Sequence, residues 1–415
     1  MTAEVHSGDV YGSDSRMALA QRWEELLDRI RRTVPGMADF QRSPSRGELL
    51  RAAAAGPVVL LNVSTLRCDA LIVTAHGVRV RELTGLTANE VAERTAEYLG
   101  ALNDSGNTDE LPFAEAMRQR AEGVERRERI LAETMRWLWA AVAEPVLLDL
   151  GYDGPPSDGE LPRIWWCPTG LLSLLPIHGA GDYGAGQGAC VLDRVISSYT
   201  PTLRALLEAS VPRAEASSAS ERLAFVGVPN VPAQLHLTDE VRREREFLEN
   251  CFPGGVDAIE GAEATAEAVF ESLSSHRHAH ISCHGFQDLD DPSGAGLELS
   301  DGLLAVRRIS TVPAACEFVF LSACRTATGG VRLADEAITL AAALSYAGFR
   351  HVVATLWSVD PAVAAELAER LYPKLISGGR FDPAGAAPAL HLAVSELRDA
   401  GVGLADWLPF VHNGL

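Results

Sequence analysis

The fold of this chain is decided by two short apolar segments: RHAHISCHG at residues 277–285 and EFVFLSACRT at residues 317–326. Each is an apolar run that stops at a polar, reactive residue, His284 in the first and Cys324 in the second. Buried parallel strands present side chains in this way at their carboxyl ends, where open α/β sheets carry their active sites. We therefore expect a base and a nucleophile on neighbouring strand ends.

Strand and helix patterns alternate on both sides of these segments. Further strands are expected at 223–228 and 351–357, a hairpin at 297–304, and helices at 238–251, 265–273, 333–347 and 361–375. Such alternation predicts an α/β fold with a mainly parallel sheet and helices on both faces.

The preceding residues contain their own strands and helices. Strands are expected at 57–63, 69–74 and 163–167, with 78–83 pairing 69–74 in a hairpin whose turn holds a solvated His76. A charged helical stretch covers about 87–149. Near the N-terminus, Trp23, Leu26, Leu27 and Ile30 share one helical face.

Several motifs together carry a family resemblance. CHG at 283–285, LSAC at 321–324 and ATLW at 354–357 look like a CHAT domain, the caspase-like peptidase relative of separase. Other landmarks follow in the expected order, namely IWWCPTG at 164–170, LLP at 174–176, the segment from Asp193 to Pro201, and WLPF at 407–410. The resemblance covers about residues 50–415.

The resemblance implies a caspase-like, mainly parallel sheet flanked by helices, with an N-terminal half of caspase shape that lacks catalytic residues. The small, polar residues 214–220 mark a boundary. The expected domains are a helical extension at 1–45, a non-catalytic half at 46–213 and a catalytic half at 214–415. No 34-residue period is visible, so we expect no built-in sensor of helical repeats.

The chemistry expected of the two reactive residues is cysteine proteolysis. An imidazolium next to Cys324 would lower its pKa from the usual value near 8.5 and so favour the nucleophilic thiolate. His284 would act as base and then as proton donor to the leaving amine. The backbone N–H groups of Gly285 and Cys324 are the expected oxyanion hole, since glycine leaves room for a substrate. Judged singly, either residue could be merely structural.

The bond that is cut is expected to follow a basic residue. LWSVD at 356–360 resembles the separase segment whose aspartate receives arginine, although the spacing here is one residue shorter. Asp360 is therefore a candidate substrate-binding residue, and Asp335 is a second one. The alternative for Asp360 is a helix N-cap, because it directly precedes Pro361. Both roles are compatible.

The histidines and the cysteine around the first segment also raise the question of a metal site. His276, His278, His280, Cys283 and His284 crowd together, but zinc sites usually combine two separated ligand pairs and no second pair is evident. We therefore expect no metal and no cofactor. Cys283 faces away from His284 because strand side chains alternate, which assigns it to the core. His278 and His280 are expected to pack or to form hydrogen bonds.

Composition narrows the setting and the partners. A formal net charge of -20 argues against nucleic acid or an anionic membrane as the main partner. No secretory signal or long apolar run is visible, and the seven scattered cysteines suit a reducing cytoplasm. We expect a cytoplasmic thiol protease of the CHAT family, a hydrolase that cleaves a protein substrate under the control of an activating partner in signalling or defence. The alternative is a catalytically silent CHAT interaction module.

Overall fold

The computed structural model describes residues 8–35, 37, 40–42, 44–103, 112–157, 159–211, 220–228, 237–286, 294–312, 316–324 and 340–415. The chain divides into two compact units, residues 1–48 and residues 49–415. The first unit contains α1 (Gly8–Thr33), which includes the predicted apolar face and begins well before it. Helix propagation adds one hydrogen bond for each further residue, which explains this extension.

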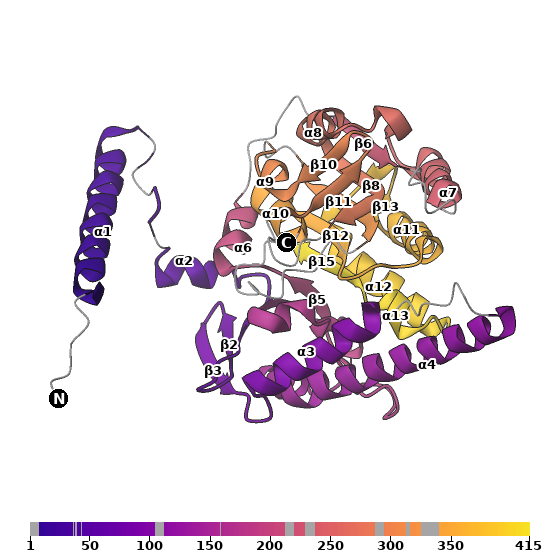
Figure 1. The fold of residues 1–415 in the computed structure, drawn as a ribbon, viewed down its shortest axis with the longest axis horizontal. Coiled ribbons are helices and arrows are strands. Elements are labelled where there is room, and N and C mark those ends of the chain that lie inside the picture. The colour runs from indigo at the N-terminus through magenta and orange to yellow at the C-terminus, as the bar shows by residue number, and fades with distance from the viewer. Residues whose placement is uncertain are drawn as a thin grey trace. The chain divides into compact units, whose positions relative to one another are not determined.

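One sheet of thirteen strands forms the centre of residues 49–415 (Figure 1). In spatial order its strands are β7 (Val256–Glu260), β6 (Ser220–Gly227), β8 (His276–Phe286), β11 (Phe318–Cys324), β12 (His351–Thr355), β15 (Phe410–Gly414), β5 (Ile196–Tyr199), β4 (Arg163–Pro168), β1 (Val58–Asn62), β2 (Asp69–Thr74) and β3 (Gly77–Glu82). The hairpin of β9 (Gly296–Leu299) and β10 (Gly302–Ala305) continues the sheet from the C-terminal end of β8. A separate small hairpin joins β13 (Ile376–Ser377) to β14 (Arg380–Phe381).

The sheet contains two sets of parallel strands that run in opposite directions. β7, β6, β8, β11 and β12 form one set, and β15, β5, β4 and β1 form the other. β15 is antiparallel to β12 and joins the two sets. The carboxyl ends of β8, β11 and β12 therefore meet at one edge of the sheet. The prediction of a mainly parallel sheet is confirmed, as are the hairpins at 69–82 and 296–305.

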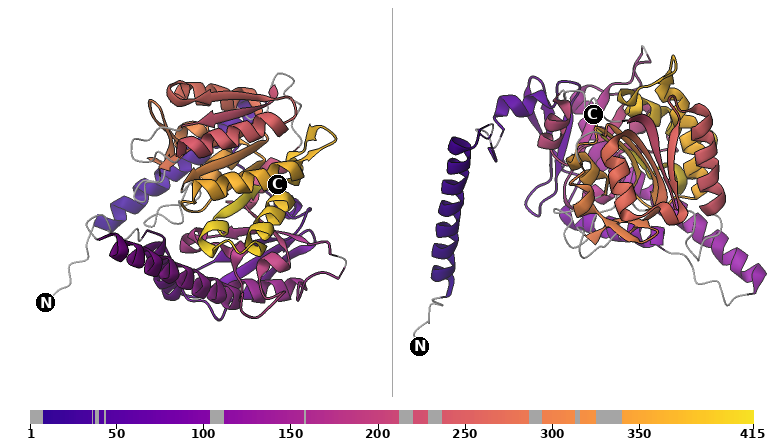
Figure 2. Two further views of the ribbon diagram at one scale, coloured as in Figure 1. Left: turned by 90° about the vertical axis from the view of Figure 1, so that its right-hand side faces the viewer. Right: turned by 90° about the horizontal axis from the view of Figure 1, so that it is seen from above.

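Helices cover both faces of the sheet, as predicted. Figure 1 shows α7 (Leu237–Cys251) and α11 (Pro361–Leu375) on one side of β8 and β11, with α9 (Val306–Ile309) and α10 (Leu340–Ala347) on the other. The view from above in Figure 2 shows these strands between the two helical layers. The remaining α-helices are α2 (Arg46–Arg51), α3 (Ala88–Asn103), α4 (Phe113–Leu138), α5 (Glu144–Leu150), α6 (Leu203–Ser210), α8 (Ala266–Ser275), α12 (Ala386–Asp399) and α13 (Leu404–Trp407).

Burial of the strands follows from their place in the sheet. Every residue of β12 is buried, as expected for a parallel strand that is covered on both faces. β3 lies at the edge and is largely exposed, with Arg79 and Arg81 as charged residues that discourage pairing with another chain. The turn before it holds the exposed His76, as predicted.

Candidate active site

The register of two neighbouring strands brings the predicted base and nucleophile together. β8 and β11 are parallel, and His284 is paired with Cys324 at the carboxyl end of β11. Adjacent strands lie about 4.8 Å apart, so the two residues are direct neighbours at one edge of the sheet. For Cys324 the structure describes the backbone, which ends β11. A base and a thiol at neighbouring strand ends are the components of a nucleophilic cysteine site.

β8 continues beyond His284, where the sequence pattern suggested that the strand ends. The strand reaches Phe286 because β9 pairs with its last residues, with Glu298 opposite His284 and Leu297 opposite Gly285. His284 is half-buried, and its Nε2 atom is buried without a hydrogen-bond partner in the described part of the chain. Gly285 is thus held in a paired strand directly beside the two candidate catalytic residues, His284 and Cys324, which are called the dyad below. Glu298, an exposed residue across from His284, was not singled out from the sequence.

A buried polar cluster lies on β8 and β11 before the reactive ends of the two strands, on the face of β8 that also holds His284. The ring of His280 is stacked between Phe225 and Phe320, with centroid distances of 5.5 Å and 4.8 Å. Its Nδ1 atom lies 3.0 Å from the Tyr372 hydroxyl. Its Nε2 atom lies 3.6 Å from Oε2 of Glu244. His280 is completely buried, so the prediction that it packs or forms hydrogen bonds is confirmed.

Glu244 on α7 is the residue of this cluster that the sequence analysis missed. Its Oε1 atom accepts a 2.7 Å hydrogen bond from the hydroxyl of Ser322 on β11. The signal was present, because Glu244 falls on the apolar face that Val241 and Leu248 define. A glutamate is rarely buried unless it is paired, so a carboxylate at a core position marks a candidate functional residue.

The candidate substrate-binding residue Asp360 follows β12 at the edge of the sheet that carries the dyad. Its side chain caps α11 and accepts a hydrogen bond from the Ala362 N–H at 2.9 Å. The carboxylate is otherwise exposed, which leaves it accessible to a basic ligand. Burial raises the pKa of Asp406, and Asp360 is one of the nearby carboxylates that raise it further. Asp335 lies outside the described residues.

The remaining cysteines whose side chains are described are free thiols, and nearly all of them are buried. Cys283 is 2% exposed, in agreement with its predicted place in the core. Burial raises the pKa of Cys167 to about 12 and that of Cys316 well above its ordinary value. These thiols are therefore poor nucleophiles at neutral pH. Within the described ranges, no group of three or more His, Cys, Asp or Glu residues could hold a metal ion.

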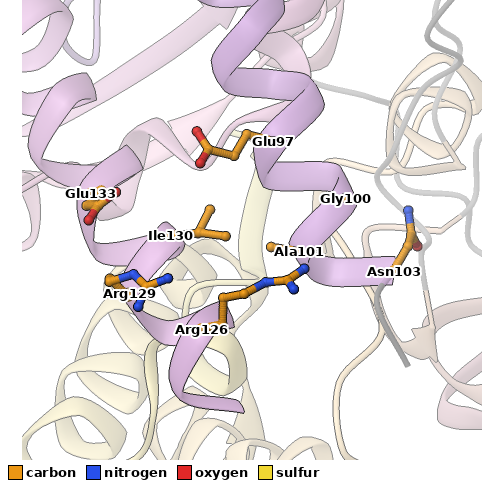
Figure 3. Close-up of a pocket in the computed structure, with 8 residues that line it drawn as sticks. All are labelled: Glu97, Gly100, Ala101, Asn103, Arg126, Arg129, Ile130 and Glu133. Carbon is orange, nitrogen blue, oxygen red and sulfur yellow. The ribbon is translucent and has the colours of Figure 1, made fainter. Parts of the chain in front are cut away.

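A groove of about 690 Å³ lies between α3 and α4 (Figure 3). Gly100, Ala101 and Ile130 contribute its uncharged lining. Charged residues of both signs surround them, namely Glu97, Arg126, Arg129 and Glu133. No dyad residue lines this groove.

Comparisons with known proteins agree with this architecture. The family model of the CHAT domain matches residues 132–414. Separase in the Saccharomyces cerevisiae separase–securin complex aligns over 89% of this chain, with 11% identity and a TM-score of 0.61. The alignment spans only 31% of the separase chain. At this identity the likeness concerns the fold, and it confirms the predicted caspase-like sheet flanked by helices.

A second solved structure is more distant. The Arg-specific cysteine proteinase gingipain R aligns over 66% of this chain and 67% of its own, with 11% identity and a TM-score of 0.43. No curated protein sequence matches the chain. None of the described helices is long and apolar enough to cross a membrane.

Proposed function

The chain belongs to the CHAT domain family, and from this premise we propose that it is a cysteine endopeptidase with Cys324 as nucleophile and His284 as general base. The observation that carries the proposal is the pairing of these two residues at the end of β11. The Nε2 atom of His284 supports it: it is buried and has no hydrogen-bond partner among the described residues, which leaves it available to exchange a proton.

The proposed reaction proceeds through an acyl-enzyme. The Cys324 thiolate, formed by transfer of its proton to His284, attacks the carbonyl carbon of the scissile peptide bond. The N–H groups of Gly285 and Cys324 stabilise the resulting oxyanion, and each such donor contributes about 2.7–4 kcal/mol to transition-state binding. His284 gives its proton to the leaving amine, and water then hydrolyses the thioester.

We assign the preference for a basic residue before the cut bond to Asp360, with Asp335 as a second candidate. A carboxylate can bind a guanidinium through two charge-assisted hydrogen bonds, which lysine matches less well. The exposed position of Asp360 beyond β12 supports this role, and its capping bond to Ala362 uses only one of its oxygens. The nearby Asp406 adds negative potential to the same region.

The proposed setting is the cytoplasm, with a protein substrate and an activating protein partner. Separase, which shares the fold, has been solved as a complex with securin, so control by a bound protein is plausible for this fold. We propose that residues 1–45 are a helical extension, residues 46–213 the non-catalytic half and residues 214–415 the catalytic half.

Co-expression with candidate partner proteins tests the function. Wild type should cut one of them after arginine or lysine, whereas Cys324→Ala and His284→Ala should not, while both variants keep the wild-type melting temperature. Retention of cleavage by either folded variant would exclude the dyad. Binding of a partner without cleavage by wild type would favour the alternative, a silent interaction module.

A further inference from the structure

Glu244 lies on the buried face of α7, where the helical pattern predicts an apolar side chain. Val241, Glu244 and Leu248 share one face of α7 and are 1%, 2% and 0% exposed. Burial of a carboxylate in an apolar environment is costly unless it is paired or hydrogen-bonded. The contacts of Glu244 offset only part of this cost, because Oε2 has no hydrogen-bond partner among the described residues.

Among the described residues, these contacts come from the two strands that carry the dyad, and Oε2 of Glu244 has no hydrogen-bond partner there. Ser322 on β11 donates a hydrogen bond of 2.7 Å to Oε1 of Glu244. His280 on β8 lies 3.6 Å from Oε2, within ion-pair range but beyond a normal hydrogen bond. Among the described residues, no lysine or arginine forms a salt bridge with Glu244. The carboxylate thus connects α7 to β8 and β11 and to no other charged group there.

Tyr372 on α11 determines how His280 faces the carboxylate. Burial, with Glu244 as a smaller cause, raises the pKa of the Tyr372 phenol well above its ordinary value, so the hydroxyl stays protonated. It can therefore donate to Nδ1 of His280, 3.0 Å away. The hydrogen of a neutral imidazole then sits on Nε2, the ring nitrogen that lies 3.6 Å from Oε2 of Glu244 and forms no hydrogen bond with the described residues.

This cluster lies on the same two strands as His284 and Cys324, a few residues before them. Ser322 precedes Cys324 by two residues on β11, about 6.6 Å away along the strand. On β8, His280 has the same parity as His284. The contacts of Glu244 with both strands thus restrict how β8 and β11 can slide or separate at their reactive ends. Such restriction matters because a misplacement of about 1 Å can cost about 10²-fold in rate.

We propose that Glu244 is a positioning residue of this site, which acts through Ser322 and His280 to hold His284 and Cys324 in register. The inference rests on the proposed function, because it concerns the same dyad. The buried carboxylate then has two effects. Glu244 costs the fold some stability, and it aligns the catalytic pair.

The test measures the pH dependence of iodoacetamide alkylation of Cys324 in the full-length protein, followed by peptide mapping. A well-aligned His284 holds the midpoint below that of a free thiol, near 8.5. Ser322→Ala and Glu244→Met should raise the midpoint and slow alkylation at pH 6.5 by about threefold or more, because a weaker imidazolium contact leaves less thiolate. Ser322→Thr, which keeps the hydroxyl, should restore the wild-type midpoint.

Stability measurements distinguish positioning from simple packing. The double variant Glu244→Met/Ser322→Ala should leave the melting temperature unchanged or raise it, because replacing both partners of this hydrogen bond by apolar groups removes the cost of burying the carboxylate. Val241→Ala, on the same helix face, should lower the melting temperature without moving the midpoint, and Glu246→Ala on the exposed face should change neither. An equal rise in the midpoint for Val241→Ala would reduce the role of Glu244 to packing.

The result for His284→Ala separates this inference from the proposed function. If His284→Ala raises the Cys324 midpoint but Ser322→Ala and Glu244→Met do not, the positioning role is wrong and the dyad stands. If His284→Ala leaves the midpoint unchanged, the dyad does not exist and both proposals fail.

Discussion

Acidification should destabilise the protein through His178, a neutral imidazole in the core. Its Nε2 atom lies 2.9 Å from the Leu408 carbonyl, which can only accept, so Nε2 carries the hydrogen. Its Nδ1 atom lies 2.9 Å from the Tyr199 hydroxyl and accepts from it. A second proton on this ring would displace that donor in a buried site. Burial accordingly lowers the pKa of His178 to about 4, although the Leu408 carbonyl opposes the shift.

The sign and size of the effect follow from proton linkage. In the unfolded chain His178 titrates near its ordinary pKa of about 6.5. Above that pH both states are neutral and the full stability is present. As the pH falls below 6.5, the unfolded state takes up a proton that the folded state does not, until the folded pKa of about 4 is reached. The loss between pH 7.5 and pH 5.0 is about 2 kcal/mol.

Urea unfolding at these two pH values, followed by tryptophan fluorescence, measures this loss. Other buried histidines contribute to the pH dependence of wild type, so the informative quantity is the difference between wild type and His178→Gln. The variant should lose about 2 kcal/mol less than wild type over this range. His76→Gln, at an exposed turn, should lose as much as wild type. An unchanged pH dependence in folded His178→Gln would refute the reasoning.

Three further predictions concern specificity, cofactors and backbone geometry. Asp360→Ala should abolish the preference for arginine in a peptide-library profile and cost about 1 kcal/mol of stability through the lost cap. Asp360→Asn should lose the preference but keep the cap. A preference of wild type for aspartate or a large apolar residue before the cut bond would contradict the assignment. Peptidase activity should survive a chelator, and a loss that zinc restores would contradict a metal-free mechanism. Gly414→Ala should lower the melting temperature strongly, because Gly414 has φ +107° and an added Cβ would lie 2.0 Å from the Arg350 carbonyl oxygen. Gly123→Ala, in open space on α4, should instead raise stability by about 0.5–1 kcal/mol. Equal effects of the two substitutions would contradict the close approach at Gly414.

Local sequence determined the elements that carry the candidate site. The Asp360-Pro361 pair marks the start of α11, and the helix runs from Pro361 to Leu375 as predicted. The apolar runs before His284 and Cys324 form parallel neighbours because strands buried on both faces have this composition. Such features depend on residues close together in the chain, so their physical causes can be read from the sequence directly.

Pairing between distant segments was decided only in the tertiary structure. No local pattern places β15 between β12 and β5, or extends β8 to Phe286 by pairing it with β9. Likewise, the sequence shows a glutamate on the apolar face of α7, but it does not show that Ser322 donates a hydrogen bond to this carboxylate or that His280 lies beside it. These outcomes depend on which surfaces must be buried together and on the register that satisfies the buried polar atoms, and both are properties of the assembled sheet and helices.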